Sequence, residues 1–355
     1  MKVAYTGTIF FNQRYGGISR YFTELVKSLK NDVKIFAPIS KNIYLKNLCF
    51  KKKKSIYIKK IPQYKSLIKA NNLITNYFIK NYNPNILHET YYSENLIKLK
   101  KYNTVLTIYD LIHEKFQNDL YKNKINEKKR LLNYVDHFIC ISEQTKKDFI
   151  EFYKVPADKV SVVYLGCDHL NIKPQKNKTD ILKDKPYLLY IGSRIKYKNF
   201  KVLFEALNKL RVKDLKLICF GGEKFSKKEF EMNNSNIEIK QIFGDDEILS
   251  NLIQNAHCYI NTSLYEGFGI PNIEAMKNGC PVICTDIPVF REICKNSAIY
   301  FDKNSSEDLA NKIDTLILSA ETKNDYINNG ISLSKIYSWE NCAINTLNIY
   351  KNLSN

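Results

Sequence analysis

Short apolar runs rich in β-forming residues, separated by stretches with helical spacing, occur along the whole chain and constrain its fold most. In the first half these runs are residues 2–5, 33–36, 55–58, 86–89, 105–109, 138–141 and 160–164. In the second half they are residues 187–191, 215–220, 237–242, 258–261, 282–285 and 299–301. Continuous apolar strands with helices between them are typical of a parallel sheet that is covered on both faces. The pattern therefore predicts an α/β protein with two Rossmann-like domains.

The length of the chain and one polar segment indicate where the two domains meet. A chain of 355 residues exceeds the size at which a single hydrophobic core usually stops growing. Residues 171–179 are polar and lack periodicity, as is typical of an interdomain linker. We expect a cleft between the two domains. The expected divisions are an N-terminal domain over residues 1–170, a linker over 171–185, a C-terminal domain over 186–335 and a helix within 336–355 with one face packed on protein.

The composition is that of a globular protein with an excess of positive charge. Hydrophobic residues make up 44% and charged residues 26%, which excludes a disordered chain. No apolar run is long enough to cross a bilayer, and residues 1–6 resemble a strand rather than a secretory signal, so we expect a cytoplasmic protein. The nine cysteines lack a CxxC pair, which indicates reduced core cysteines. The net charge of +19 leaves three acidic partners open: nucleic acid, an anionic membrane surface or a phosphorylated substrate.

The segment from residue 263 to residue 275 combines two carboxylates with a glycine-bracketed turn before a helix. Pro271 suits the first helical position, because its fixed φ fits there and it has no N–H to satisfy, so we expect the helix to begin at Pro271. Free N–H groups at such a terminus bind anions such as a phosphate oxygen. The amides expected near that anion belong to Gly267, Phe268, Gly269 and Ile270. Glu266 and Glu274 would repel the anion, so we expect their oxygens to face hydroxyl groups on either side of it, as in a nucleotide sugar.

Two further loops carry residues suited to a charged ligand. Gly16 and Gly17 follow the first strand and precede a helical run over residues 21–29, where glycines either let the backbone approach a ligand or form a plain turn. Arg194 and Lys198 follow the first strand of the second half, at the carboxyl end where open α/β sheets bind ligands. Arginine can hold a phosphate with two parallel hydrogen bonds, and lysine supplies a point charge. A solvated pair of basic side chains is the alternative.

Three motifs, in this order, make the chain resemble a known family. They are Gly-Gly-Ile-Ser-Arg-Tyr at residues 16–21, Gly-Ser-Arg with Tyr-Lys-Asn at 192–199, and Tyr-Glu-Gly-Phe-Gly-Ile-Pro at 265–271 followed by Glu274. The combination resembles glycosyltransferase family 4, the retaining enzymes of the GT-B fold, and the resemblance covers essentially the whole chain. The first motif is similar to that of the branch that contains bacterial mannosyltransferases of O-antigen and capsule assembly.

The resemblance implies a role for each matching residue of the second half. Glu274 would hold the ribose hydroxyls of the donor nucleotide, and Glu266 would contact the hydroxyls of the transferred sugar. The amides around Phe268 and Gly269 would lie near the diphosphate. The resemblance also implies that the C-terminal helix crosses back to the N-terminal domain.

No metal ion and no cofactor are expected. Many metal-dependent glycosyltransferases hold the diphosphate through an Asp-x-Asp motif, but Asp245 and Asp246 are adjacent and are expected to begin a helix. Arg194 and Lys198 would instead neutralise the leaving diphosphate, whose charge grows in the transition state. No nucleophile is evident, which fits the front-face transfer with retention that the family implies.

The resemblance further implies a substrate class. A hexose, with mannose from GDP-mannose as the first choice, would be moved to a lipid-linked or growing cell-surface oligosaccharide of O-antigen, capsule or lipopolysaccharide assembly. A family 4 transferase that uses a UDP- or dTDP-sugar is the alternative. Two other classes stay open: a sugar-nucleotide enzyme without transfer, such as an epimerase, and a basic nucleic-acid-binding protein. The chain has no RNA-recognition or zinc signature, so we expect no nucleic-acid partner.

The first domain has a less specific set of candidates at the ends of its strands. Asp110 and His113 either bind the acceptor or the sugar, or have a structural role such as helix capping. His88, with Glu89 and Tyr91, ends the preceding strand, and the same two alternatives apply to it. Many family members have histidine where this chain has Tyr109, so no catalytic role is assigned to Tyr109.

Much of the positive charge lies in one segment of the first domain. Lys51, Lys52, Lys53 and Lys54 precede further lysines and a run of apolar helical positions between residues 67 and 78. Each basic residue close to anionic lipid contributes about 1 kcal/mol to binding. We expect peripheral binding to the inner face of the plasma membrane, where a lipid-diphosphate acceptor would lie. A solvated lysine run beside a helix packed on its own sheet is the alternative.

Overall fold

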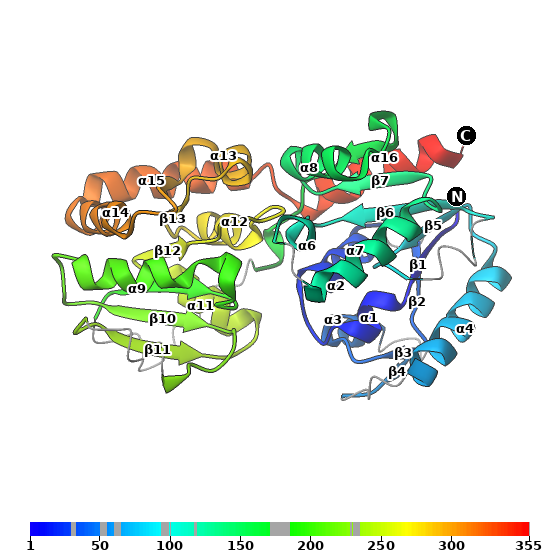
Figure 1. Cartoon of the computed structure of the whole chain (residues 1–355), viewed down its shortest axis with the longest axis horizontal. Coiled ribbons are helices and arrows are strands. Elements are labelled where there is room, and N and C mark those ends of the chain that lie inside the picture. The colour runs from blue at the N-terminus through cyan, green and yellow to red at the C-terminus, as the bar shows by residue number, and fades with distance from the viewer. Residues whose placement is uncertain are drawn as a thin grey trace. The chain divides into compact units, whose positions relative to one another are not determined.

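The chain folds into two compact units (Figure 1). The structure, a computed structural model, describes residues 1–29, 33–49, 55–59, 65–93, 99, 101–116, 119–170, 185–227, 229 and 235–354. Unit 1 comprises Met1–Leu165 and Trp339–Asn355, and unit 2 comprises Gly166–Ser338. The N-terminal part of unit 1 thus ends at residue 165, where the sequence predicted residue 170. Residues 171–184 of the expected linker lie outside the described residues.

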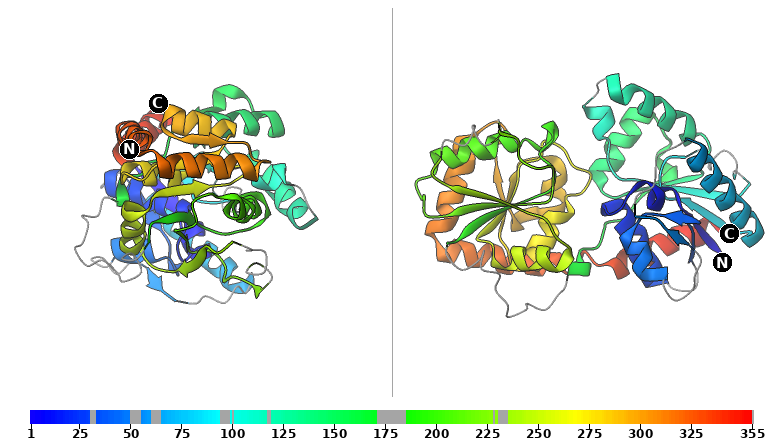
Figure 2. Two further views of the ribbon diagram at one scale, coloured as in Figure 1. Left: turned by 90° about the vertical axis from the view of Figure 1, so that its left-hand side faces the viewer. Right: turned by 90° about the horizontal axis from the view of Figure 1, so that it is seen from below.

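Unit 1 is built on a parallel sheet with the strand order β2-β1-β5-β6-β7-β8. Its strands are β1 (Val3–Thr6), β2 (Val33–Phe36), β5 (Ile86–Glu89), β6 (Asn103–Ile108), β7 (His137–Cys140) and β8 (Val160–Val162). The described helices of this unit are α1 (Thr8–Asn12), α2 (Gly17–Leu29), α3 (Ile43–Cys49), α4 (Lys65–Tyr82), α6 (Ile112–Lys115), α7 (Asp119–Leu132), α8 (Glu143–Tyr153) and α16 (Trp339–Ser354). Helices cover both faces of the sheet (Figure 2), which confirms the expected Rossmann-like architecture.

One expected strand of unit 1 does not join this sheet. The run at residues 55–58 contributes only β4 (Ile56–Tyr57), which pairs in parallel with β3 (Ile39–Ser40) in a separate two-stranded sheet. In the main sheet, β2 and β5 flank β1, so the direction in which the chain adds strands reverses between β1 and β5. Open α/β sheets bind ligands in the loops at such a reversal. Thr6 and Glu89 are the last residues of these two strands.

The last helix of the chain, α16, belongs to unit 1 and packs on α2. The Tyr350 hydroxyl lies 3.1 Å from the Tyr5 hydroxyl and 2.5 Å from Nδ1 of His88. At the other end of α16, the ring of Trp339 lies 6.3 Å from the ring of Tyr21 between centroids. These side chains are buried, so the C-terminal helix supplies part of the core of unit 1.

Unit 2 is built on a second parallel sheet, with the strand order β11-β10-β9-β12-β13-β14. Its strands are β9 (Tyr187–Ile191), β10 (Lys216–Phe220), β11 (Glu238–Ile242), β12 (Cys258–Asn261), β13 (Val282–Thr285) and β14 (Ile299–Phe301). The described helices are α9 (Phe200–Lys209), α11 (Asp246–Asn255), α12 (Ile270–Lys277), α13 (Pro288–Cys294), α14 (Ser306–Leu318) and α15 (Ala320–Ser334). The strand order reverses between β9 and β12, so the loops after these two strands lie at the position where such sheets bind ligands.

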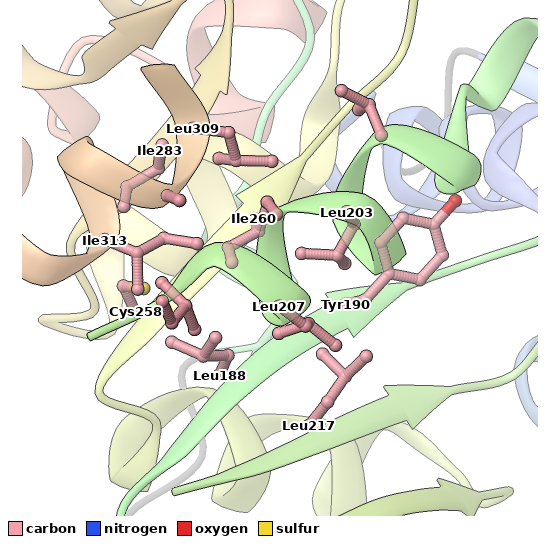
Figure 3. Packing of buried hydrophobic residues seen from close by; sticks show 14 of the residues in the cluster. Leu188, Tyr190, Leu203, Leu207, Leu217, Cys258, Ile260, Ile283, Leu309 and Ile313 are labelled. Carbon is pink, nitrogen blue, oxygen red and sulfur yellow. The ribbon is translucent and has the colours of Figure 1, made fainter. Parts of the chain in front are cut away.

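The core of unit 2 fixes the strands that carry these loops. Leu203 and Leu207 of α9 are fully buried and lie one helical turn apart, facing Leu188 of β9 and Ile260 of β12 (Figure 3). Full burial of one such side chain contributes about 1.5–3 kcal/mol. The packing therefore holds β9 and β12 rigidly where their carboxyl ends present polar residues.

Several smaller expectations are also met. The eight cysteines whose side chains the structure describes are buried and free, as expected of reduced core cysteines. Asp245 is the N-cap of α11 and accepts the N–H groups of Glu247 and Ile248 at 3.2 Å, which confirms that the aspartate pair begins a helix. Among the described helices, none is both long and apolar enough to span a bilayer.

Candidate functional site

The loop between β12 and α12 contains the segment with two carboxylates. Gly269 precedes the helix with a φ of +86°, and a Cβ there would lie 2.6 Å from Cε1 of Phe290, so both backbone angle and space require glycine. The helix begins at Ile270, so the predicted start at Pro271 is wrong by one residue. Proline is tolerated at this second position because first-turn N–H groups have no intrahelical acceptor.

The start of α12 offers a small number of backbone donors. The N–H of Asn272 is bonded to the Gly269 carbonyl at 2.9 Å, and Pro271 has no N–H. Two amides of the predicted set, those of Gly269 and Ile270, stand directly at this terminus, where the helix dipole favours negative charge. The ring of Phe268, the residue before Gly269, is buried and packs edge-on against Tyr337, with 5.6 Å between the ring centroids. This packing holds the chain in place just before the helix.

Two buried asparagines hold the loop to the helix, and sequence reasoning missed both. Asn261 ends β12, and its Nδ2 donates to Oδ1 of Asn272 at 2.9 Å. The Oδ1 of Asn261 accepts the N–H of Ser263 at 3.2 Å. The Nδ2 of Asn272 lies 3.4 Å from Sγ of Cys294. Because these amides bond to each other and to the chain, the loop geometry depends on side chains that no charge or glycine pattern reveals.

Glu266 and Lys198, predicted from different loops, contact each other directly. The Lys198 ammonium donates to Oε1 of Glu266, and the Ser263 hydroxyl donates to the same oxygen at 2.7 Å. The Thr262 hydroxyl donates to the Lys198 carbonyl at 2.6 Å and joins the two loops. Both charged side chains are mostly buried. The structure thus brings together the carboxylate and the cation that sequence reasoning assigned to the sugar and the diphosphate.

Glu274 is held by a histidine that sequence reasoning also missed. The Nε2 of His169 lies 3.0 Å from Oε1 of Glu274, and both side chains are largely buried. His169 belongs to a short 3-10 helix, Asp168–Leu170, far from α12 in sequence. A single histidine beside a polar segment carries no pattern, so only the fold reveals this pair.

Arg194 is more enclosed than its predicted role requires. Its Nε donates to Oε1 of Glu229 at 2.9 Å, and its Nη2 donates to the Glu223 carbonyl at 2.5 Å. The guanidinium lies over the ring of Phe225, 3.8 Å from the centroid, and only 3% of the side chain is exposed. Nη1 is buried and has no hydrogen-bond partner among the described residues. Because Nε and Nη2 already donate to the protein, the contact of Arg194 with a phosphate stays a prediction.

The glycine pair of unit 1 begins a helix. Helix α2 starts at Gly17, four residues before the helical run that the sequence predicted from Tyr21. The Gly16 carbonyl accepts the N–H of Arg20 at 3.0 Å and the hydroxyl of Ser19 at 3.0 Å. Small residues at this terminus leave the backbone of the helix start uncovered by side chains of their own.

Asp110 and His113 lie at the end of β6 and the start of α6. The Oδ1 of Asp110 accepts the N–H of Ile112 at 3.0 Å, which is a local structural role of the kind that the sequence left open. His113 is partly buried, and burial lowers its pKa. Binding of the acceptor or the sugar by Asp110 or His113 stays a prediction.

His88 is a core residue, and Tyr109 lies partly buried at the end of the next strand. Both ring nitrogens of His88 are bonded, Nδ1 to the Tyr350 hydroxyl and Nε2 to the Thr107 hydroxyl at 2.8 Å. Burial lowers the pKa of His88 to about 3, so the ring is neutral. Tyr109 is partly buried and lies edge-on against Tyr21. Because the ring of His88 is fully buried and both its nitrogens are bonded, the structure favours the structural alternative for this residue.

The neighbouring Glu89 differs from His88. It ends β5 and accepts hydroxyl hydrogens from Thr6 and, at 2.7 Å, from Thr8, while its Oε2 is buried and has no hydrogen-bond partner among the described residues. Burial raises the pKa of Glu89 to about 6, partly offset by these hydrogen bonds. The carboxylate thus lies at the strand reversal of unit 1 but is enclosed.

Two expectations concern other parts of the chain. Lys51, Lys52, Lys53 and Lys54, which were predicted to contact a membrane, lie outside the described residues. Within the described residues, no group of three or more His, Cys, Asp or Glu side chains is arranged to hold a metal ion.

Solved structures of glycosyltransferases have this fold. A glycosyltransferase from Rickettsia africae ESF-5 matches with a TM-score of 0.72 at 23% identity, over 99% of this chain and 98% of that chain. HepE of Anabaena, in complex with UDP-glucose, matches with a TM-score of 0.77 at 15% identity, over 98% of this chain and 100% of that chain. The fold is therefore that of the GT-B glycosyltransferases.

Sequence comparison narrows the class to a family. Residues 15–169 match the model of Glycosyltransferase Family 4, and residues 171–333 match that of Glycosyl transferases group 1. O-antigen chain mannosyltransferase B of Escherichia coli is 26% identical over 227 residues, which are 60% of this chain and 60% of that relative. The chain thus spans less than two thirds of the curated relatives that it matches first. It belongs to glycosyltransferase family 4, as its motifs predicted.

Proposed function

We propose that the protein is a retaining, metal-independent glycosyltransferase that moves a hexose from a nucleotide sugar to a saccharide acceptor. The observation that carries the proposal is the loop of unit 2 in which Glu266 and Glu274 bracket the N-terminus of α12. Carboxylates accept hydrogen bonds from hydroxyl groups, so Glu266 suits the sugar and Glu274 the ribose. The amides of Gly269 and Ile270 suit the diphosphate between them.

The proposed mechanism places cations beside the leaving group. As the bond between the sugar and the diphosphate breaks, negative charge grows on the nucleoside diphosphate, so cations already in place stabilise the transition state more than the ground state. Lys198 has two N–H donors beyond the one that contacts Glu266, and Nη1 of Arg194 has no hydrogen-bond partner among the described residues. The leaving phosphate would then accept the proton of the acceptor hydroxyl, and no protein nucleophile is needed.

A substitution at Lys198 tests this assignment. Lys198→Ala should lower kcat for transfer or donor hydrolysis by about 100-fold, because one preorganised charge is lost. Lys201→Ala is the matched control, since Lys201 is 71% exposed and its described ion pair, to Glu205, is a surface pair on α9. Equal loss in both variants would contradict the role of Lys198. Activity of the wild type that disappears with EDTA and returns with a divalent cation would contradict metal independence.

The donor is proposed to be GDP-mannose, since a relative is an O-antigen chain mannosyltransferase. HepE, which shares the fold, binds UDP-glucose, so a UDP-sugar is the alternative. A thermal-shift panel of GDP, UDP and dTDP separates them, because a ligand at 100 times its Kd stabilises a protein by about 2.7 kcal/mol. Incubation with the matching nucleotide sugar then tests the reaction class. Isomerisation of the sugar without hydrolysis or transfer would support an epimerase and contradict the proposal.

The acceptor is proposed to be lipid-linked and to be met at an anionic membrane surface, as in O-antigen or capsule assembly. Helix α4 of unit 1 supports this part of the proposal, because it exposes four large apolar side chains. They are Leu73, Ile74, Tyr77 and Phe78, with 61%, 40%, 63% and 46% of their surface accessible. The buried face of the same helix carries Asn71, Thr75 and Asn76 beside Ile79.

A helix that only packs on its own sheet has the opposite pattern, with its apolar side chains buried and its polar side chains exposed. Exposed Lys69 and Lys80 lie on the same helix, and a basic helix with outward apolar side chains suits the interface of an anionic bilayer. The apolar positions predicted to face a membrane are thus exposed at Ile74, Tyr77 and Phe78, whereas the lysine run is not described. A protein that binds through this helix would be a peripheral protein at the inner face of the plasma membrane.

A further inference from the structure

The carboxylate proposed to hold the ribose has a partner outside the three sequence motifs. The Nε2 of His169 lies 3.0 Å from Oε1 of Glu274, and only 4% and 9% of the two side chains are exposed. A carboxylate oxygen can only accept hydrogen bonds, so His169 is the donor. The contact joins a residue near the start of unit 2 to the first turns of α12.

The backbone that carries His169 is itself fixed. Two residues before His169, Cys167 donates its N–H to the Tyr337 carbonyl at 3.1 Å. The following residue, Leu170, is fully buried, and its carbonyl accepts the hydroxyl of Ser250 from α11 at 3.2 Å. The backbone beside His169 is thus anchored and its side chain is almost fully buried, so the imidazole has little room to move and its contact restricts the rotation of the Glu274 carboxylate.

The second oxygen of Glu274 is left for a ligand. Among the described residues, no donor contacts Oε2 of Glu274. A ribose presents two neighbouring hydroxyls, and a carboxylate whose orientation is fixed can accept from both, through Oε2 and the remaining lone pair of Oε1. Without the histidine, the carboxylate would rotate among several orientations, and part of the binding energy would be lost in ordering it.

We propose that His169 is a positioning residue that makes the site selective for ribonucleotides, by fixing the Glu274 carboxylate toward the 2′ and 3′ hydroxyls. The inference rests on the proposed function, since it takes the ligand of Glu274 to be the ribose of a nucleotide sugar. His169 touches neither the sugar nor the diphosphate in this arrangement, so it acts on nucleotide selectivity and not on the chemical step.

The test compares the Kd of a ribonucleoside diphosphate, whichever of GDP and UDP the wild type binds more tightly, with that of its 2′-deoxy analogue. The wild type should prefer the ribose form about tenfold, the effect of one hydrogen bond to a charged group. His169→Met, which fills a similar volume without a donor, should bring that ratio close to one. His169→Gln should restore most of it, because its Nε2 stands where the imidazole Nε2 stood. His137→Ala, at a partly buried histidine bonded to Ser161 in unit 1, is the control that should leave the ratio unchanged.

The outcomes separate the inference from the proposed function. An unchanged ratio in a folded His169→Met protein, with or without a lower Tm, would show that the histidine only supports the fold and would overturn the inference. Equal affinity of the wild type for the ribose and deoxyribose forms would overturn it as well. A wild type that binds no nucleoside diphosphate at all would instead contradict the proposed function. If His169→Met does not fold, the same ratio is measured with His169→Ala.

Discussion

At the scale of single residues, the backbone conformation of Gly269 determines how the two carboxylates of the candidate site are placed. Its left-handed conformation ends the loop that carries Glu266 and starts the helix that carries Glu274, so the spacing of the two carboxylates depends on it. A second glycine of unit 2, Gly279, also has a positive φ, of +73°, but a Cβ there would meet nothing closer than 3.9 Å. The pair allows the cost of backbone strain to be separated from that of a steric clash.

Gly269→Ala should therefore be more destabilising than Gly279→Ala. Both substitutions place a side chain in the left-handed region, at about 1 kcal/mol. Gly269→Ala adds the clash with Phe290, for which overpacking of a tight site costs about a further 1–3 kcal/mol. Urea denaturation of the two variants and the wild type measures the difference. Equal losses of unfolding free energy would mean that the ring of Phe290 moves aside at no cost.

His88 should make unit 1 sensitive to acid. The folded state keeps its ring neutral with a pKa of about 3, whereas the unfolded chain takes up a proton near the ordinary value of 6.5. Below pH 6.5 the unfolded state thus binds more protons, and the unfolding free energy falls by about 1.4 kcal/mol for each pH unit, down to about pH 3. His88→Gln should remove this slope, measured by urea denaturation between pH 7 and pH 4.

Glu89 titrates in the opposite sense, since its pKa of about 6 in the folded state lies above the ordinary 4.5 and adds stability as the pH falls between those values. Because both proteins contain Glu89, the difference between His88→Gln and the wild type isolates the histidine. His137→Gln, at a partly buried histidine, should keep most of the slope. A wild type whose stability does not change between pH 6.5 and pH 4 more steeply than that of His88→Gln would contradict the assignment.

At the scale of elements, the parallel sheets could be predicted from the sequence, but the residues that hold the side chains of the site in place could not. Buried parallel strands are continuous apolar runs, so β5, β9 and β12 were predicted with the bounds that they have. The start of α12 was missed by one residue because proline is compatible with more than one position of a first turn. Glycines and charges at loop ends pointed to Glu266 and Lys198, but the partners of such residues come from segments distant in sequence, as His169 does for Glu274.

The same limit applied to the last helix, α16. Its apolar spacing predicted a packed face, but its polar anchor, the contact of Tyr350 with Tyr5 and His88, follows from tertiary structure alone. Tyr350→Phe should cost about 1–3 kcal/mol of unfolding free energy, because two buried polar groups lose a partner. Tyr77→Phe is the matched control, since Tyr77 is 63% exposed and should change stability little. Equal effects in urea denaturation would argue against a docking role for the Tyr350 hydroxyl.

At the scale of the whole molecule, the net charge of +19 and the exposed apolar side chains of α4 act in the same direction. In the proposed membrane binding, charge would attract the protein to an anionic bilayer from a distance that salt screens, whereas apolar side chains would act only on contact. Binding that needs both should weaken when either is removed. A protein that was merely basic would lose all vesicle binding in high salt and none on loss of an exposed leucine.

Sedimentation with phosphatidylserine-containing vesicles tests this combination. The wild type should sediment at low salt and less at high salt, and Leu73→Ser should weaken binding about tenfold at low salt, since burial of one leucine is worth about 1.5–3 kcal/mol. Leu318→Ser is the matched control, because Leu318 is a similarly exposed leucine in unit 2, at 68% against 61% for Leu73. No sedimentation of the wild type at low salt would remove the membrane proposal. Equal weakening by both substitutions would mean that α4 is not the contacting face.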